Sequence, residues 1–112
     1  MIIHILRNQA TKEQLSEMLQ SLKTYVKLAV DVQRGVIAGG GEMHADCEAD
    51  LLEDGSQQED VWGADWYPDL QEVKYESLIN IRPRQNNRSM EVQDPALRER
   101  IAAIVRPLLE GI

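Results

Sequence analysis

The spacing of apolar residues predicts an amphipathic helix near each end of the chain. Over residues 12–23 the apolar positions recur at intervals of three and four, which places them on one side of a helix. Thr11 and Gln14 have the spacing of a capping box at its start. For the second helix, Asp94 supplies the N-cap and Pro95 the first helical position. Its buried stripe is expected to consist of Leu97, Ile101, Ile104, Val105 and Leu108.

Between these helices apolar residues alternate with polar ones, which is typical of strands with one buried face. Strands are expected here over residues 25–32, 36–41, 42–53, 56–67 and 72–81, and a further strand over residues 2–6 precedes the first helix. Their apolar face must be covered, and the two helices are the only elements available to cover it. The sequence therefore predicts an α+β fold, an antiparallel β-meander with two amphipathic helices packed on one face.

The turns between the strands set the expected register of the meander. Asp54–Gly55 favours a type I′ hairpin, because both central residues of that turn need positive φ. Counting outward from this turn pairs Cys47 with Trp62. A four-residue turn over residues 68–71 then pairs Trp66 with Val73. In this register both tryptophans lie on one apolar face, and the opposite face is charged.

Size and composition narrow the class of protein. The chain has 112 residues, 43% of them hydrophobic, which suits a single domain spanning residues 1–112. No segment approaches the roughly 20 apolar residues of a membrane span. Cys47 is the only cysteine, so no intramolecular disulfide can form and the cytoplasm is the expected compartment. A formal charge of −7 disfavours binding to nucleic acid.

The charged face of the predicted meander contains a candidate metal site. Residues two apart on a strand project the same way about 6.6 Å apart, so His44, Asp46 and Asp65 could converge on one divalent ion. With an arginine holding an anionic substrate, this cluster would make the protein a metal-dependent hydrolase. The competing interpretation is a solvated face crossed by a ladder of His44, Asp65 and Lys74, which needs no cofactor. We favour this second interpretation, because exposed ion pairs of this kind are common on protein surfaces.

A polar loop before the C-terminal helix, the Arg82–Ser89 loop, contains the second candidate site. It concentrates positive charge in an acidic chain, and guanidinium forks suit carboxylate and phosphate groups. The residues expected to bind are Arg82, Arg84, Asn86, Asn87 and Arg88. The leading hypothesis is therefore a binding module, rather than an enzyme, that recognises a small anionic ligand or an acidic partner. The alternative is that these arginines neutralise acidic residues of the protein itself.

Self-association is also expected. Leu52, Val61 and Leu78 fall together on the otherwise polar face of the predicted sheet. The two short helices leave the sheet edges uncovered. A symmetric homodimer is the simplest arrangement that would bury these surfaces.

Two further features are interpreted as structural. The glycines at 39–41 have no helix after them, so a bend is favoured over a phosphate cradle. Cys47 falls on the apolar face of the predicted sheet, where a buried small hydrophobe is favoured over a nucleophile.

Four segments of the chain resemble a small bacterial family of uncharacterised proteins. They are residues 38–48, 60–64, 79–85 and 87–91. The similarity spans nearly the whole chain. The family is a domain of unknown function with no assigned catalytic residues, so the resemblance implies no site.

Overall fold

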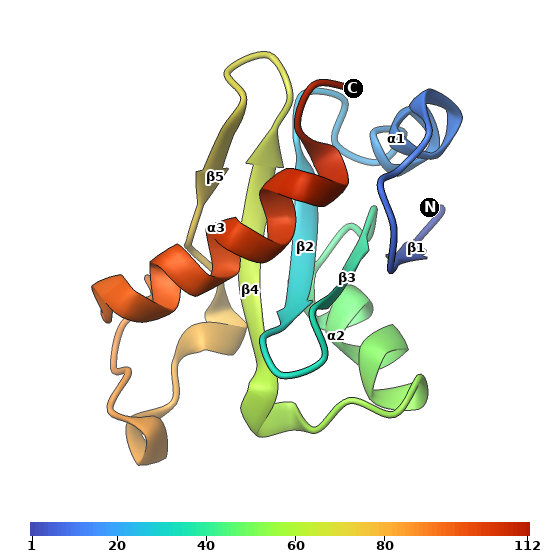
Figure 1. Cartoon of the computed structure of the whole chain (residues 1–112). Helices are drawn as coiled ribbons and strands as arrows, with labels where there is room; N and C mark the ends of the chain where they lie inside the picture. Colours follow the sequence, from blue (N-terminus) through green and yellow to red (C-terminus); the bar gives the residue numbers. More distant parts are fainter.

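The computed structural model describes all residues, 1–112, and confirms the α+β class: a five-stranded antiparallel sheet with three α-helices (Figure 1). The strands are β1 (His4–Leu6), β2 (Val26–Asp31), β3 (Val36–Gly39), β4 (Val61–Tyr67) and β5 (Glu72–Lys74). The helices are α1 (Lys12–Met18), α2 (His44–Glu53) and α3 (Pro95–Leu109). There are also three short 3-10 helices: η1 (Gln58–Asp60) directly before β4, and η2 (Leu78–Asn80) and η3 (Pro83–Gln85) between β5 and α3. No helix combines the length and apolar character needed to cross a membrane.

The strand order β1-β3-β2-β4-β5 explains why helices cover both faces of the sheet. The connections β1–α1–β2 and β3–α2–β4 each pass over one strand and step in the same direction across the sheet. Because β1 and β3 are antiparallel, right-handed crossovers place α1 and α2 on opposite faces. In Figure 1, α3 crosses in front of the sheet and α2 lies behind it.

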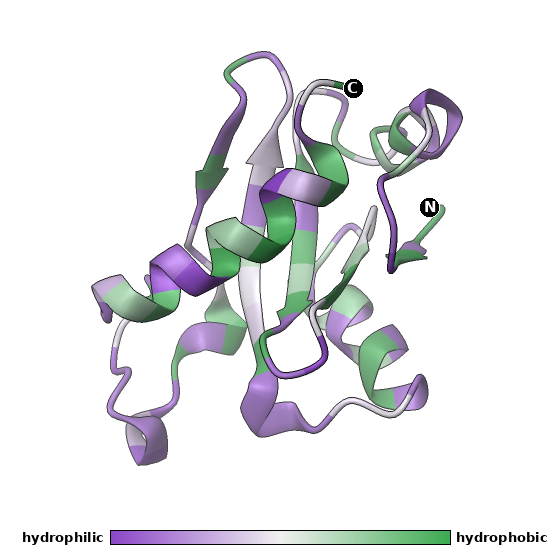
Figure 2. Cartoon of the chain, viewed as in Figure 1, coloured by the Kyte–Doolittle hydropathy of each residue, from purple (hydrophilic) through white to green (hydrophobic).

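The larger core lies on the face covered by α1 and α3. Leu15 and Met18 of α1 and Ile101 of α3 pack there with both tryptophans, and Trp66 is fully buried. The predicted N-caps of both helices are present, at Thr11 and Asp94. The central strand β2 is mostly hydrophobic (Figure 2). The prediction that the two terminal helices share the tryptophan face is therefore correct.

The prediction of a strand over residues 42–53 is wrong, because this segment forms α2. Its buried residues His44, Cys47 and Leu51 recur at three and four, the spacing of a helix. Asp54–Gly55, predicted as a hairpin turn, ends α2 instead: Asp54 is its C-cap and Gly55 follows with φ +108°. Positive φ after a helix is the usual place for glycine.

The new helix changes what lies opposite β4. Trp62 pairs with Val30 of β2, not with Cys47, and Cys47 lies on the other face of the sheet. Val61 is fully buried beside Cys47 beneath α2. Leu52, Val61 and Leu78 were expected to form an exposed apolar group that drives dimerisation. This group does not form, because Val61 is buried.

The register between β4 and β5 is as predicted, but β5 is shorter than expected. Trp66 pairs with Val73, and β5 ends at Lys74. Beyond it the side chain of Asn80 takes the place of a neighbouring strand: its Oδ1 accepts from the Gly63 N–H (2.8 Å) and its Nδ2 donates to the Gly63 carbonyl (3.0 Å). A Cβ on Gly63 would lie 2.4 Å from Cβ of Ser77. Gly63 thus lets the chain after β5 fold closely over β4.

Candidate functional site

A cavity of about 740 Å³ lies where the N-terminus of α2 faces β4 and β5; we call it the α2–β5 cavity. Residues 75–79, which leave the sheet after β5, and residues 90–91 before α3 form further parts of its wall. Tyr25 and Lys27, on the β2 side, and Arg98 of α3 complete it. The volume is in the range of small-molecule sites, which are commonly 300–1,000 Å³. The lining mixes apolar, aromatic and charged side chains, with His44 and Asp65 among them.

His44 and Asp65 form a buried hydrogen-bonded pair in the cavity wall. His44 is the first residue of α2, and its Nε2 lies 2.8 Å from Asp65 Oδ1 and 3.1 Å from the Ala64 carbonyl oxygen. Both partners are acceptors, so Nε2 carries the proton. Each side chain is only 10% exposed. The pair was predicted from the sequence, but a helix rather than a strand supplies the histidine.

Two lysines lie on either side of Asp65. In the sheet register Lys27 of β2 and Lys74 of β5 are the direct cross-strand neighbours of Asp65. The Lys27 ammonium donates to the Glu42 carbonyl oxygen (3.0 Å), and the Lys74 ammonium lies 4.6 Å from the centre of the Tyr67 ring. Neither lysine forms a salt bridge. The sequence reasoning identified Lys74 in this position and missed Lys27, because it did not pair β2 with β4.

Asp46, the third residue of the predicted metal cluster, is used elsewhere. Its carboxylate accepts from the backbone N–H of Met43 (3.1 Å) at the start of α2. In a strand, Asp46 would project to the same side as His44. In the helix that forms instead, residues two apart point in different directions. No three His, Cys, Asp or Glu side chains of the chain come together in an arrangement that could hold a metal ion.

The structure buries Arg82, the first arginine of the Arg82–Ser89 loop. Its guanidinium donates to the carbonyl oxygens of Ile79 (2.9 Å) and Gln58 (2.7 Å). It also pairs with Glu48 of α2 (3.2 Å) and lies 4.7 Å from the centre of the Trp62 ring. Burial lowers the pKa of Arg82, and the Glu48 carboxylate opposes this shift. Arg82 is therefore bound within the protein, as the alternative interpretation of the loop expected.

The asparagines of the loop also have internal roles. Asn87 is 4% exposed, and its Nδ2 donates to three backbone carbonyl oxygens, of Asn80, Ser89 and Glu91. Asn86 ends η3 in the left-handed conformation, with φ +59°. Of the five residues predicted to bind an anion, only Arg84 and Arg88 are exposed arginines without a salt bridge. Arg84 and Arg82 line a second, more open cavity of about 980 Å³.

Cys47 is not available as a nucleophile. It is fully buried, and burial raises the pKa of its thiol to about 11.

We expect Cys47 to resist alkylation by iodoacetamide in the native protein. At pH 8 a thiol with a pKa of about 11 is ionised in about one molecule in a thousand, and only the thiolate reacts. Mass spectrometry should show slow modification in native buffer and complete modification in denaturing urea. Equal rates under the two conditions would contradict the buried position.

Comparison with protein families gives one match. The model of a protein family of unknown function, DUF5674, matches residues 4–108. The match covers nearly the whole chain and confirms the resemblance noted from the sequence. Comparison with curated proteins and with solved structures gives no match.

Proposed function

We propose that this chain, which belongs to the family described as protein of unknown function DUF5674, is a binding module for a small anionic ligand. The proposed site is the α2–β5 cavity. The observation that carries the proposal is the position of Lys27 and Lys74 at this cavity, on either side of Asp65 and without a salt bridge. In a chain with a formal charge of −7, two ammonium groups at one cavity that form no salt bridge favour negative charge at this place.

The N-terminus of α2 adds positive charge to the part of the cavity where Lys27 and Lys74 lie; we call this part the positive end of the cavity. His44 and Ala45 line the cavity, and they are the first two residues of the helix. The N–H groups of a first helical turn have no partner within the helix, and the helix dipole is positive there. No side chain caps this end from the N-cap position. An anion at this end of the cavity would therefore meet both the amide groups and the ammonium groups.

The site differs from the one expected from the sequence, although the class of function is the same. Arg82 and Asn87 of the Arg82–Ser89 loop are bound within the protein, which leaves Arg84 and Arg88 as the free arginines. The alternative of a metal-dependent hydrolase lacks support from a third ligand, since Asp46 caps α2. The proposed function is therefore still a binding module, but its site is the α2–β5 cavity and not the Arg82–Ser89 loop.

Replacing both Lys27 and Lys74 with glutamine should weaken binding of an anionic probe at least tenfold. A bound ligand at a hundredfold excess over its dissociation constant stabilises the folded state by about 2.7 kcal/mol. A thermal-shift screen of phosphates, nucleotides and carboxylates would therefore find the probe. A hydrogen bond to a charged group contributes about 1.5–3 kcal/mol, and each 1.4 kcal/mol corresponds to a tenfold change in affinity.

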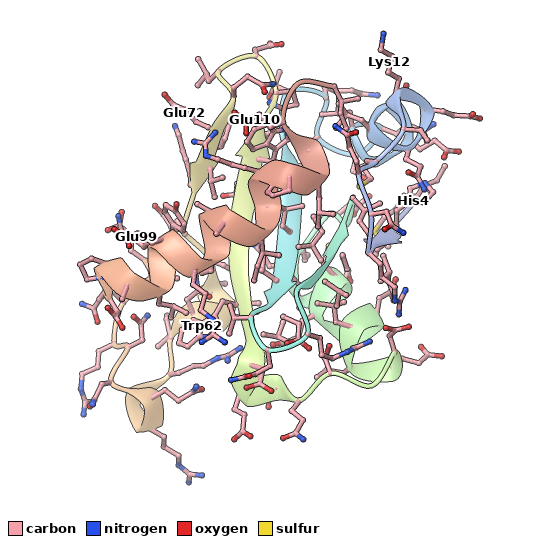
Figure 3. All side chains as sticks on the ribbon, in the orientation of Figure 1. His4, Lys12, Trp62, Glu72, Glu99 and Glu110 are labelled. Atoms are coloured by element: carbon pink, nitrogen blue, oxygen red, sulfur yellow. The ribbon has the colours of Figure 1, made fainter.

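Two variants serve as controls for this experiment. Lys12→Gln removes one charge from an exposed lysine that points away from the sheet on α1, and it should leave binding unchanged (Figure 3). Arg84→Ala combined with Arg88→Ala tests the loop. If this loop variant loses the probe while the double lysine variant keeps it, the loop is the site and the α2–β5 cavity is not.

The proposal places the protein in the cytoplasm. Its support is the single cysteine, which is buried as a thiol with a raised pKa and has no partner for a disulfide. A symmetric dimer also remains a proposal. Because Val61 is buried, its support is now a group of exposed apolar side chains that line the α2–β5 cavity: Met43, Leu78 and Met90.

A further inference from the structure

The lining of the α2–β5 cavity carries information about the ligand beyond its charge. From it we infer that the ligand is an amphipathic monocarboxylate, a single carboxylate attached to an aliphatic or aromatic body. This inference rests on the proposed function, because it names the ligand class of the same site. Three properties of the lining support it: its apolar side chains, its charge balance, and the unused nitrogen of His44.

The first property is a group of exposed apolar side chains. Met43, Leu78 and Met90 are 52%, 63% and 37% exposed, and all three line the cavity. They come from three separate places in the chain: the N-cap of α2, the first residue of η2 and the segment before α3. Apolar side chains gathered around a concave site favour a ligand with an apolar body. The two methionines can adapt their shape to it, since their side chains are flexible and polarisable.

The second property is the charge balance of the lining. Three basic and three acidic side chains line the cavity, so their formal sum is zero. They are Lys27, Lys74, Arg98, Asp65, Glu76 and Glu91. The N-terminus of α2 adds the equivalent of roughly half a positive charge. A single negative charge is closer to this balance than two, and a dianion would be repelled more strongly by the nearby carboxylates and by the net charge of the chain.

The third property is a ring nitrogen of His44 that forms no hydrogen bond within the protein. The His44 side chain is nine-tenths buried, and its Nε2 is bound to Asp65 and Ala64. Its Nδ1 has no hydrogen-bond partner in the protein. The Asp65 contact at Nε2 holds the ring in place, which leaves Nδ1 as an oriented polar atom. The first amides of α2 offer donors to the carboxylate oxygens.

The experiment is a titration of the whole ¹⁵N-labelled chain, followed by NMR, with four probes. Octanoate has the inferred chemistry, and acetate has its charge without the apolar body. Octyl phosphate has the body with a second charge, and octylamine has the body with the opposite charge. We expect octanoate to bind at least tenfold more tightly than the other three and to shift the amide signals of His44 and Ala45.

Two matched variants test the apolar wall. Leu78→Gln should weaken octanoate binding about tenfold, the effect of withdrawing one leucine from an apolar contact. Leu70→Gln is the control, because Leu70 is 57% exposed, lies in the turn between β4 and β5 and does not line the cavity. Both leucines are exposed, so both variants should fold. Equal octanoate affinity in the two variants would overturn the inferred apolar body.

The outcomes separate this inference from the proposed function. If acetate or octyl phosphate binds as tightly as octanoate at the His44 and Ala45 amides, the anion site stands and the ligand class is wrong. If octylamine binds as tightly as octanoate, the site does not select anions and both proposals fail, as they do if no probe binds. Light scattering on the same samples tests a second copy of the chain as the occupant. A dimer that Leu78→Gln converts to a 12.7 kDa monomer, with no probe bound, would assign the apolar wall to self-association.

Discussion

Replacing Asn80 with alanine is expected to lower the free energy of unfolding by about 4 kcal/mol. Asn80 is fully buried, and its amide holds both the N–H and the carbonyl of Gly63 as well as the Met90 carbonyl (3.1 Å). Alanine would leave the Gly63 N–H and carbonyl buried without these partners, and each such group costs about 1–3 kcal/mol. The Met90 carbonyl would keep its hydrogen bond from the Ser77 N–H (2.9 Å). The chain after β5 would then lose its attachment to β4.

Urea unfolding of the variant and of Asn8→Ala provides the measurement. Asn8 is an exposed asparagine, so its replacement should change the free energy of unfolding by less than about 0.5 kcal/mol. Hydrogen exchange gives an independent test, because the Gly63 amide should be protected in the original protein and should exchange faster in the Asn80 variant. If Asn80→Ala lowers the free energy of unfolding by less than about 1 kcal/mol, the Asn80 amide does not replace a neighbouring strand, because unsatisfied buried groups would cost more than this.

Replacing Arg82 with alanine should have the next largest effect, a loss of about 3–4 kcal/mol. The Arg82 and Glu48 side chains are 10% and 12% exposed. Removing the arginine leaves a buried carboxylate without its cation and removes the guanidinium from the Trp62 ring. Arg84→Ala is the matched control in the same loop, and its effect should stay within about 0.5 kcal/mol because Arg84 is exposed.

The pH dependence of this loss identifies its cause. Burial already raises the pKa of Glu48, and Arg82 opposes that shift. Without Arg82 the pKa should rise further, and a carboxyl group with a raised pKa in the folded state favours folding at low pH. The deficit should therefore shrink as the pH falls through the pKa of Glu48 in the folded variant, because the neutral carboxyl tolerates burial. If Arg82→Ala unfolds at the same urea concentration as the original protein but binds the anionic probe weakly, Arg82 is a binding residue and not a structural one.

Substituting both members of this pair tests how much the ion pair itself contributes. A hydrophobic pair of similar volume often replaces a buried ion pair at little cost, whereas removing one partner does not. Arg82→Met combined with Glu48→Met should therefore be more stable than Arg82→Ala. The double substitution would also show whether the pair is needed to hold α2 against the start of β4.

The elements with local signals can be identified from the amino-acid sequence. The N-caps Thr11 and Asp94 and the three- and four-residue spacing after them identify α1 and α3, because a helix satisfies its own backbone hydrogen bonds. The register of β4 and β5 follows from a short turn between them. The same register placed Asp65 beside Lys74, so part of the candidate site could be predicted from the residues alone.

Residues 42–53 show why alternation alone was not enough. Cys47 and Leu51 are four apart, which fits both the period of a strand and that of a helix. The segment has no β-branched residue and is rich in alanine, glutamate and leucine, a local preference for helix that outweighs the alternation. With β2 and β5 on the two edges of β4, the sheet offers this segment no place as a strand. It instead covers Ala29, Ala38 and Val61 on the second face of the sheet.

Which polar residues are free to bind depends on contacts between distant segments of the chain. Arg82, Arg84 and Arg88 look alike in the sequence, but Arg82 lies against Trp62 and Glu48, which are 20 and 34 positions away in the chain. Lys27 reaches the cavity because β2 pairs with β4, a contact between segments separated by α2. Such pairings depend on which surfaces the whole chain must bury, and local spacing does not encode them.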